Sequence, residues 1–416
     1  MGFPEKDRRI VRDLARRIAE VAALPVQDEK RAMWRKLNHL ETVRPMVWIN
    51  ELPWDELKDQ DALVCRASDE FCRGIERELR WTLYNWDYCR TDMVVDGVYY
   101  AHPVFQSTGF GVERHAVYGN RGAAGFGSCD FVPIMRTDAD IDRIQTPTVT
   151  ADREATERKL AQTSDLIGDL MPVQQRGIVS HWGAPWDILI QWWGIQELYT
   201  DMVDRPDFVN RGISRMVDAL MGQLDQFEAL GLLGVSNGNH RVGSGGLGIT
   251  DELPQKDYDG VHARPIDQWG SSTGQIFSGV SPAMHEEFCL RHELRWLARF
   301  GLNCYGCCEP LHNKLGILKQ VPRLRRVSMS TWIDVDKAAE RVGRDYVFSY
   351  KPNPAVFAWD EWNPDAARAD LRRVLDRTRG NVVELIMKDV STCRNQPHRI
   401  HEWCTLAVEV AEEYAR

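Results

Sequence analysis

The sequence predicts an α/β protein, a (β/α)8 barrel of the TIM type carrying an N-terminal helical extension. Three observations lead to this class. Short apolar runs alternate with helical segments throughout the second half of the chain, about eight such runs can be counted in all, and residues 1–90 show helical rather than strand spacing. Repeated βα units imply a parallel sheet, and eight of them close into a barrel.

The N-terminal part reads as helices. Apolar residues recur at helical spacing between residues 5 and 40, with a break near Pro25, and a second helix is expected over residues 56–86. The first convincing strand is Met93-Val94-Val95. We therefore divide the chain into an N-terminal helical extension, residues 1–90, and a TIM-barrel catalytic domain, residues 91–416.

The middle of the chain mixes strands with two unusually polar segments. Residues 107–128 are rich in glycine and too long for a simple connector, which predicts a hairpin or a lid. Residues 237–273 are rich in Gly, Asn, His and Asp and predict a long functional loop. Strands are expected at 177–182 and 234–236, and helices at 187–203 and 206–230.

The second half repeats strand and helix regularly. Ser281-Pro282, Asp334 and Asn363-Pro364 have the residue types that begin helices. A doubly wound open sheet is the alternative architecture, but no G-x-G-x-x-G or Walker-type loop supports it. Strands are expected at 275–278, 302–305, 326–330, 346–350 and 382–387, and the last helix at about 397–415.

Charge and composition exclude several classes of function. The formal net charge of −9 argues against a nucleic-acid-binding protein, which needs a basic face. The longest apolar runs fall short of the roughly 18 residues of a membrane span. The N-terminus lacks the apolar segment of a signal peptide, so we expect a cytoplasmic protein. Ten cysteines in 416 residues are too sparse for a disulfide scaffold.

Chemically capable side chains follow several of the predicted strands. The run Cys307-Cys308-Glu309 ends one strand, Lys351 ends another, and Lys388-Asp389 ends the last. The carboxyl ends of barrel strands meet on one face, where such enzymes keep their chemistry. We therefore predict Glu309, Lys351, Lys388 and Asp389 as catalytic residues, the lysines holding an anion or donating a proton.

The cysteines of this region also suggest a metal. Thiolates and carboxylates bind zinc, so Cys307, Cys308, Glu309 and Cys393 form a candidate ligand set with one position open for catalysis. Each residue has a plainer explanation as well. Strand-end cysteines are often simply buried, and a carboxylate at the start of a helix suits the helix dipole.

Other polar and aromatic residues near strand ends are candidates for substrate binding. Fifteen tryptophans are many, and several cluster near Trp182. They fit either helix-packing core or an aromatic wall around an apolar ligand. The predicted substrate-binding residues are Asp96, His181, Trp182, Asn237, His240 and Trp332.

At these residues the chain resembles the uroporphyrinogen decarboxylase superfamily. The run from Tyr305 to Pro310 lies where related methyltransferases carry a His-x-Cys zinc motif, and Cys393 lies close to their second cysteine. Lys351-Pro352-Asn353-Pro354 stands where the family has a Gly-Asn-x-x-Pro turn. The arginine-rich N-terminal signature of true decarboxylases is missing from the sequence. Tyr305 occupies the position of the usual histidine ligand, which departs from the standard zinc site.

The resemblance implies a methyltransferase of the corrinoid-dependent branch. Such an enzyme would move a methyl group between a small O- or N-methylated substrate and a corrinoid (cobalamin-type) protein, a thiol or a folate, with zinc as cofactor. Two alternatives stay open: a metal-free decarboxylase or lyase of a carboxylated substrate, and a tetrapyrrole- or corrinoid-binding protein. The expected partners are a small molecule and a corrinoid protein, with no nucleic acid or membrane; a homodimer is possible.

Overall fold

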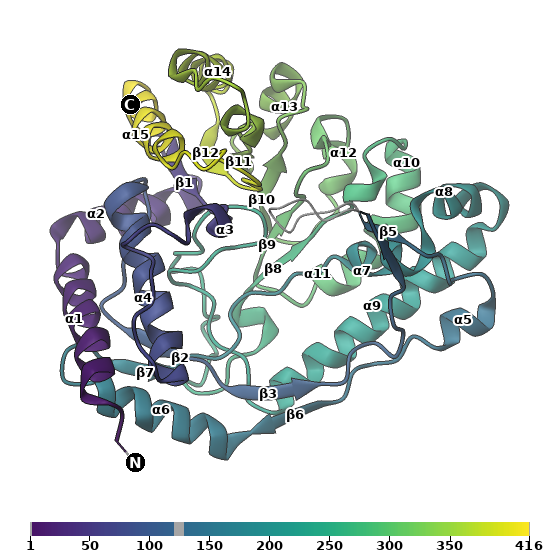
Figure 1. Ribbon diagram of the computed structural model, residues 1–416. Helices are drawn as coiled ribbons and strands as arrows, with labels where there is room; N and C mark the ends of the chain where they lie inside the picture. The colour runs from purple at the N-terminus through teal and green to yellow at the C-terminus, as the bar shows by residue number, and fades with distance from the viewer. Residues whose placement is uncertain (1, 120–128, 416) are drawn as a thin grey trace.

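The computed structural model describes residues 2–119 and 129–415. Its centre is a parallel sheet of six strands in the order β1-β12-β11-β10-β9-β8, which forms an arc in Figure 1. Most residues of these strands are buried, as expected where a parallel sheet is covered on both faces. The strands are β1 (Met46–Ile49), β8 (Trp269–Ser272), β9 (Leu302–Tyr305), β10 (Leu324–Met329), β11 (Val347–Tyr350) and β12 (Val382–Met387).

The sheet is not closed, so the eight-stranded barrel is not confirmed. Its edges are β1 and β8. Residues 93–95, expected as a strand, are buried but do not pair as one, and residues 178 and 233 meet only in an isolated parallel bridge. The edge strand β1 comes from Met46–Ile49, within the range expected to be purely helical, and pairs in register with β12.

A row of helices covers the outer side of this arc (Figure 1). Their N-termini match the sequence signals: the side chains of Ser281, Asp334 and Asn363 accept hydrogen bonds from backbone amides of the first helical turn. A π-helical turn, η3 (Glu286–Leu290), separates α10 from α11. The helices are α10 (Pro282–His285), α11 (Arg291–Leu297), α12 (Leu315–Leu318), α13 (Val335–Val342), α14 (Pro364–Arg377) and α15 (His398–Glu413).

The N-terminal helices form a second layer with its own apolar cluster. Helix α1 packs against α4 and α6, and buried Val11, Ile18, Leu79 and Leu166 fill the space between them. None of the described helices is both long and apolar enough to cross a membrane. The elements are α1 (Glu5–Ala22), α2 (Pro25–Asn38), α3 (Trp54–Leu57), α4 (Glu70–Tyr88) and α6 (Arg153–Ile167).

An antiparallel pair of strands begins in the polar segment expected to be a hairpin or lid and ends just after it. β4 (Ala116–Tyr118) pairs with β5 (Cys129–Phe131), while residues 120–128 lie outside the described part of the chain. Two further pairs join β2 (Tyr99–Ala101) to β7 (Val173–Gln175) and β3 (Val104–Ser107) to β6 (Val149–Asp152). The remaining helices are α5 (Asp138–Asp142), α7 (Pro185–Trp193), α8 (Ile195–Asp204) and α9 (Pro206–Ala229).

The prediction of a strand at 275–278 is wrong. Those residues form a short 3-10 turn, η2 (Gln275–Phe277), and the strand lies earlier, at Trp269–Ser272. The apolar residues of this segment have another role: Phe277 is buried against Trp186 of α7. The true strand contains Gly270 and two serines, which weakens its apolar signal.

Candidate functional site

The turn that follows β9 places the two adjacent cysteines. Gly306 has φ +95, which a residue with a side chain rarely adopts, and a Cβ there would lie 2.4 Å from Leu311 Cδ1. After this turn Cys307 is buried and Cys308 is exposed, with their sulfur atoms 3.6 Å apart. The two thiols are close enough to share one proton.

Lys388 and Asp389, at the end of β12, meet these thiols. Lys388 Nζ lies 3.6 Å from Cys308 Sγ and 2.5 Å from Asp389 Oδ2. Asp389 Oδ2 is also 3.5 Å from Cys308 Sγ, and the residue has φ +56, a conformation that aspartate tolerates better than most. Residues from the ends of β9 and β12, which are remote in sequence, thus lie together in one charged cluster. We call Cys307, Cys308, Lys351, Lys388 and Asp389 the strand-end cluster.

The cluster sets the acidity of its thiols. The hydrogen bond from Cys308 lowers the pKa of Cys307, and the nearby Lys388 ammonium adds to this effect against the cost of burial. The same sharing, together with burial, raises the pKa of Cys308. Burial alone would lower the pKa of Lys388, but the charges of Cys307 and Asp389 outweigh it and raise that pKa. These shifts favour a thiolate on Cys307 over one on Cys308, beside a lysine that stays protonated.

Lys351 is the second buried cation of the cluster, with 5% of its surface exposed. Its ammonium donates to the carbonyl oxygen and the hydroxyl of Ser349, at 2.9 and 2.6 Å, and Ser349 in turn donates to Glu384. Burial lowers the pKa of Lys351 to about 8, although Glu384 and the nearby thiols oppose the shift. Lys351 is thus a cation that can lose its proton near neutral pH.

The four residues expected to bind zinc do not converge on one point. Both carboxylate oxygens of Glu309 accept hydrogen bonds of 2.8 to 3.1 Å, from Thr273 Oγ1, Gly274 N and Cys307 N. The thiol of Cys393 instead donates to Glu56 at 3.2 Å. Beside Cys308, the Lys388 ammonium already supplies the positive charge. This donor set does not fit a zinc ion, and we derive no step through one here.

The structure adds a carboxylate that sequence reasoning missed. Asp187, in the first turn of α7, accepts a hydrogen bond of 2.8 Å from the indole of Trp182 and weaker ones from Gln275. Burial raises the pKa of Asp187, and the charge of Lys388 opposes this rise, which brings Asp187 within the electrostatic range of the cluster. Asp187 was missed because it lies in an apolar, Trp-rich segment that predicts a packed helix. Its partner Trp182 is among the predicted substrate-binding residues.

The other predicted substrate-binding residues are spread over separate surroundings. His181 bonds Gln268, His240 bonds Ser236, and Asn237 bonds the carbonyl of Leu253. Burial lowers the pKa of His181 to about 4 and that of His240 to about 3, so both are neutral parts of a packed polar network. Trp332 is 73% exposed. Asp96 pairs with Arg31 at 3.0 Å.

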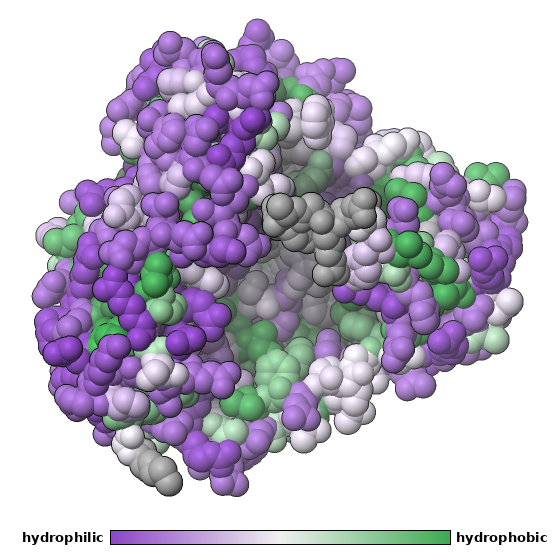
Figure 2. Space-filling model, in the orientation of Figure 1, coloured by the Kyte–Doolittle hydropathy of each residue, from purple (hydrophilic) through white to green (hydrophobic). Residues whose placement is uncertain are grey.

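A cavity of about 640 Å³ opens near the end of β1, between α4 and residues 93–102. Aromatic side chains line it, including Trp48, Trp54 and Tyr100, and Asp96 borders it. Glu51 connects it to the strand-end cluster, because Glu51 lines the cavity and accepts a bond of 3.1 Å from the Asp389 amide. The face drawn in Figure 2 is hollowed near its middle, with hydrophobic residues in the hollow.

Comparison with solved structures supports the fold. A methyltransferase from Methanosarcina mazei superposes with a TM-score of 0.51 over 92% of this chain and 98% of that chain, at 9% sequence identity. Identity this low establishes similarity of fold alone. No family model and no curated protein matches the sequence. The resemblance to the uroporphyrinogen decarboxylase superfamily is therefore not confirmed.

Proposed function

We propose that the protein is a methyltransferase that removes a methyl group from a small O- or N-methylated substrate at the strand-end cluster. The observation that carries this proposal is the shared-proton thiol pair beside charged Lys388, at the carboxyl end of a parallel sheet. The fold is also similar, over nearly its whole length, to that of a protein named as a methyltransferase.

The residues of the cluster have separable roles in this proposal. As the bond from the methyl carbon to the substrate oxygen breaks, the carbon bonds to the acceptor, and the Lys388 ammonium stabilises the leaving oxyanion by its charge and a hydrogen bond until water protonates that oxygen. The charges of Cys307 and Asp389 keep Lys388 protonated throughout. The acceptor would be a corrinoid carried by a partner protein, a thiol or a folate, and it supplies the nucleophile.

The cavity beside Glu51 suits the substrate. Aromatic walls favour a flat apolar group such as a methoxyaryl ring, and the volume of about 640 Å³ is within the range of small-ligand sites. Glu309, whose oxygens are all engaged, would shape the cysteine turn rather than move protons.

A metal-free decarboxylase or lyase is the second candidate. It is favoured by two buried lysines, Lys351 and Lys388, of which Lys388 adds to burial in lowering the pKa of Lys351. Two ammonium groups are suited to holding a carboxylate, and a pKa of about 8 for Lys351 suits proton donation.

One experiment separates these functions. The purified protein is incubated with 2-methoxyphenol and reduced free cobalamin, and separately with aromatic carboxylic acids, while catechol and carbon dioxide are measured. We expect catechol to form, and Lys388→Met to reduce its rate at least tenfold, whereas the exposed-lysine control Lys319→Met leaves the rate unchanged. Carbon dioxide without demethylation would favour the lyase, and equal rates in both variants would contradict the assigned site.

A further inference from the structure

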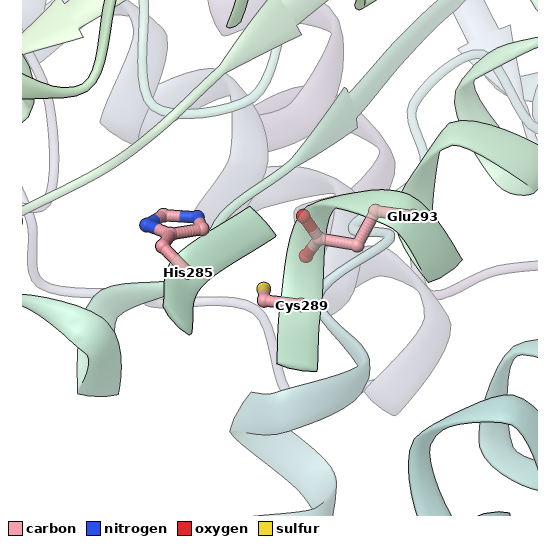
Figure 3. Close-up of side chains that lie close together, drawn as sticks. All are labelled: His285, Cys289 and Glu293. Carbon is pink, nitrogen blue, oxygen red and sulfur yellow. The ribbon is translucent and has the colours of Figure 1, made fainter. Parts of the chain in front are cut away.

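A second group of reactive side chains lies behind the sheet, away from the strand-end cluster. His285, Cys289 and Glu293 project from successive turns of α10, η3 and α11, and all three are fully buried. One donor atom from each lies within 4.8 Å of the others. Figure 3 shows the three side chains directed toward a common volume. Among the described residues, this is the group of three metal-ligand types that meets this distance.

The backbone explains why the three residues converge. They are spaced four apart, and in a regular α-helix each such step turns about 40° past a full circle. The π-helical turn Glu286–Leu290 lies between His285 and Glu293 and changes this progression. Such turns lower helix stability and recur at functional sites. The π-helical turn would have a function if it brings these three side chains together as metal ligands.

Tyr305 completes the group from the side of the sheet. Its hydroxyl lies 2.7 Å from His285 Nε2 and 2.7 Å from Glu293 Oε2. Residues alternate along a strand, so Tyr305 faces the helices while Cys304 faces the opposite side of the sheet. The other oxygen of Glu293 accepts a bond of 2.7 Å from Ser272 on β8. Imidazole, thiol, carboxyl and phenol therefore surround one point.

Within the described chain no salt bridge reaches Glu293, whose oxygens accept hydrogen bonds from Tyr305 and Ser272 instead. The buried ammonium of Lys314 acts electrostatically on His285 and Cys289. His285 Nδ1 is buried and has no hydrogen-bond partner among the described atoms. A divalent cation would bind this imidazole, thiol and carboxyl in their deprotonated forms.

We propose that His285, Cys289, Glu293 and Tyr305 form a buried zinc site that fixes η3 and α11 to β9. Bonds of 2.0 to 2.3 Å place the donors of tetrahedral zinc roughly 3.3 to 3.8 Å apart. The donors of His285, Cys289 and Glu293 lie at most 4.8 Å apart, and the Tyr305 hydroxyl lies 2.7 Å from those of His285 and Glu293, so these separations bracket that range. Imidazole, thiolate and carboxylate are ordinary zinc ligands, and the phenol oxygen adds a fourth. This site does not depend on the proposed methyl transfer.

The zinc site would support the catalytic turn from behind. A Cβ at Gly274 would lie 2.9 Å from Cys289 Sγ and 3.0 Å from His285 Nε2, so the backbone at Gly274 directly borders the ligands. The amide of the same residue donates to Glu309, which holds the cysteine turn. The proposed zinc site is therefore structural, and it is linked to the cysteine turn through Gly274 and Glu309.

The test uses metal content and cobalt spectroscopy. Zinc per chain is measured by mass spectrometry, and apo protein is then titrated with Co²⁺ while thiolate-to-cobalt charge-transfer absorption is recorded. The variants are Cys289→Ser, the near-isosteric Glu293→Gln, the double variant Cys307→Ser with Cys308→Ser, and Cys72→Ser. Cys72 is buried in the N-terminal helical layer and serves as the matched control.

We expect one equivalent of metal and the charge-transfer band in wild type, in Cys72→Ser and in the double variant. Cys289→Ser should lose the band, and Glu293→Gln should weaken cobalt binding about tenfold or more. If Cys289→Ser does not fold, Glu293→Gln decides. The proposal is overturned if wild type shows no band, if Glu293→Gln binds cobalt like wild type, if the band survives in folded Cys289→Ser, or if the double variant abolishes it.

Discussion

The two sulfur atoms of Cys307 and Cys308, 3.6 Å apart, act as one titrating unit beside Lys388. Removing the first proton is made easier by the ammonium and by the remaining S–H, while removing the second places two negative charges together. The Cys308 hydrogen bond is the main cause of the lowered Cys307 pKa, and the side chain of Lys388 adds to it.

Lys388→Met should raise the pKa of the first thiol ionisation, because an adjacent opposite charge is lost. The measurement is the rate of iodoacetamide alkylation against pH, with the modified cysteine identified by mass spectrometry. Lys319→Met, at an exposed site, should leave the midpoint unchanged. An unchanged midpoint in Lys388→Met would show that the ammonium does not stabilise the thiolate.

Lys351 should make stability rise with pH. Its folded pKa of about 8 lies below the ordinary lysine value, so between those two pH values the unfolded chain binds more protons. Raising the pH through this window favours the folded state. Relative to Lys351→Met, wild type should gain about 2 kcal/mol between roughly pH 8 and pH 10. Urea denaturation of both proteins across this range checks it, and a parallel course of the two curves would refute it.

Sequence reasoning found the strand-end residues but not all of their directions. Cys307, Cys308, Lys388 and Asp389 meet as strand-end positions in a parallel sheet should. Glu309 and Cys393 turn toward other partners, because the direction of a loop side chain depends on local hydrogen bonds that no periodicity encodes. The catalytic role of Glu309 stays a prediction, and with these partners the predicted zinc ligands do not converge.

At the scale of elements, the turn between β9 and the cysteines depends on Gly306. Gly306→Ala should cost about 2 kcal/mol or more, since φ +95 disfavours a side chain and its Cβ would meet Leu311. Gly316→Ala, in α12 with open space around it, should be neutral or slightly stabilising. Chemical denaturation compares the two, and equal effects would mean that the turn can relax.

Elements with strong local signals were predicted well. The helix starts at Ser281, Asp334 and Asn363 are confirmed by their capping bonds, and the strands Leu302–Tyr305 and Val382–Met387 match to the residue. The π-helical turn could not be predicted, because its residues fit an ordinary helix.

At the scale of the whole molecule, a buried ion pair joins distant parts of the chain. Arg326 on β10 and Glu384 on β12 are fully buried, with Arg326 Nε 3.2 Å from Glu384 Oε1. Arg326 also donates to Asn38 of α2, and Glu384 accepts from the amide of Gly246. The pair thus ties the sheet to the N-terminal layer and to the long loop.

Glu384→Gln should destabilise the protein by about 3 kcal/mol, because it leaves the Arg326 guanidinium buried without an opposite charge. Glu340→Gln, on the exposed side of α13, should change stability by less than about 0.5 kcal/mol. The free energy of unfolding in urea measures both. A loss below about 1 kcal/mol in Glu384→Gln would mean that Asn38 and nearby carbonyls suffice for the arginine.

The α/β class and the parallel sheet were predictable from alternation alone, but closure of the sheet was not. Closure depends on whether short segments such as residues 93–95 form ladders, and they are too short to show it by pattern. The strand Met46–Ile49 was missed because four apolar residues between helices resemble a helix end.

The pairing of β1 with β12 has a consequence for how the chain is made. Met46 pairs with Glu384, so β1, the first strand of the sheet to be synthesised, has no partner strand until β12, the last one, has been made. Helix α15, which packs on β1, arrives later still. Contacts this remote in sequence form slowly. The nascent chain therefore carries an unpaired apolar strand through nearly all of its synthesis, and the final residues complete the sheet.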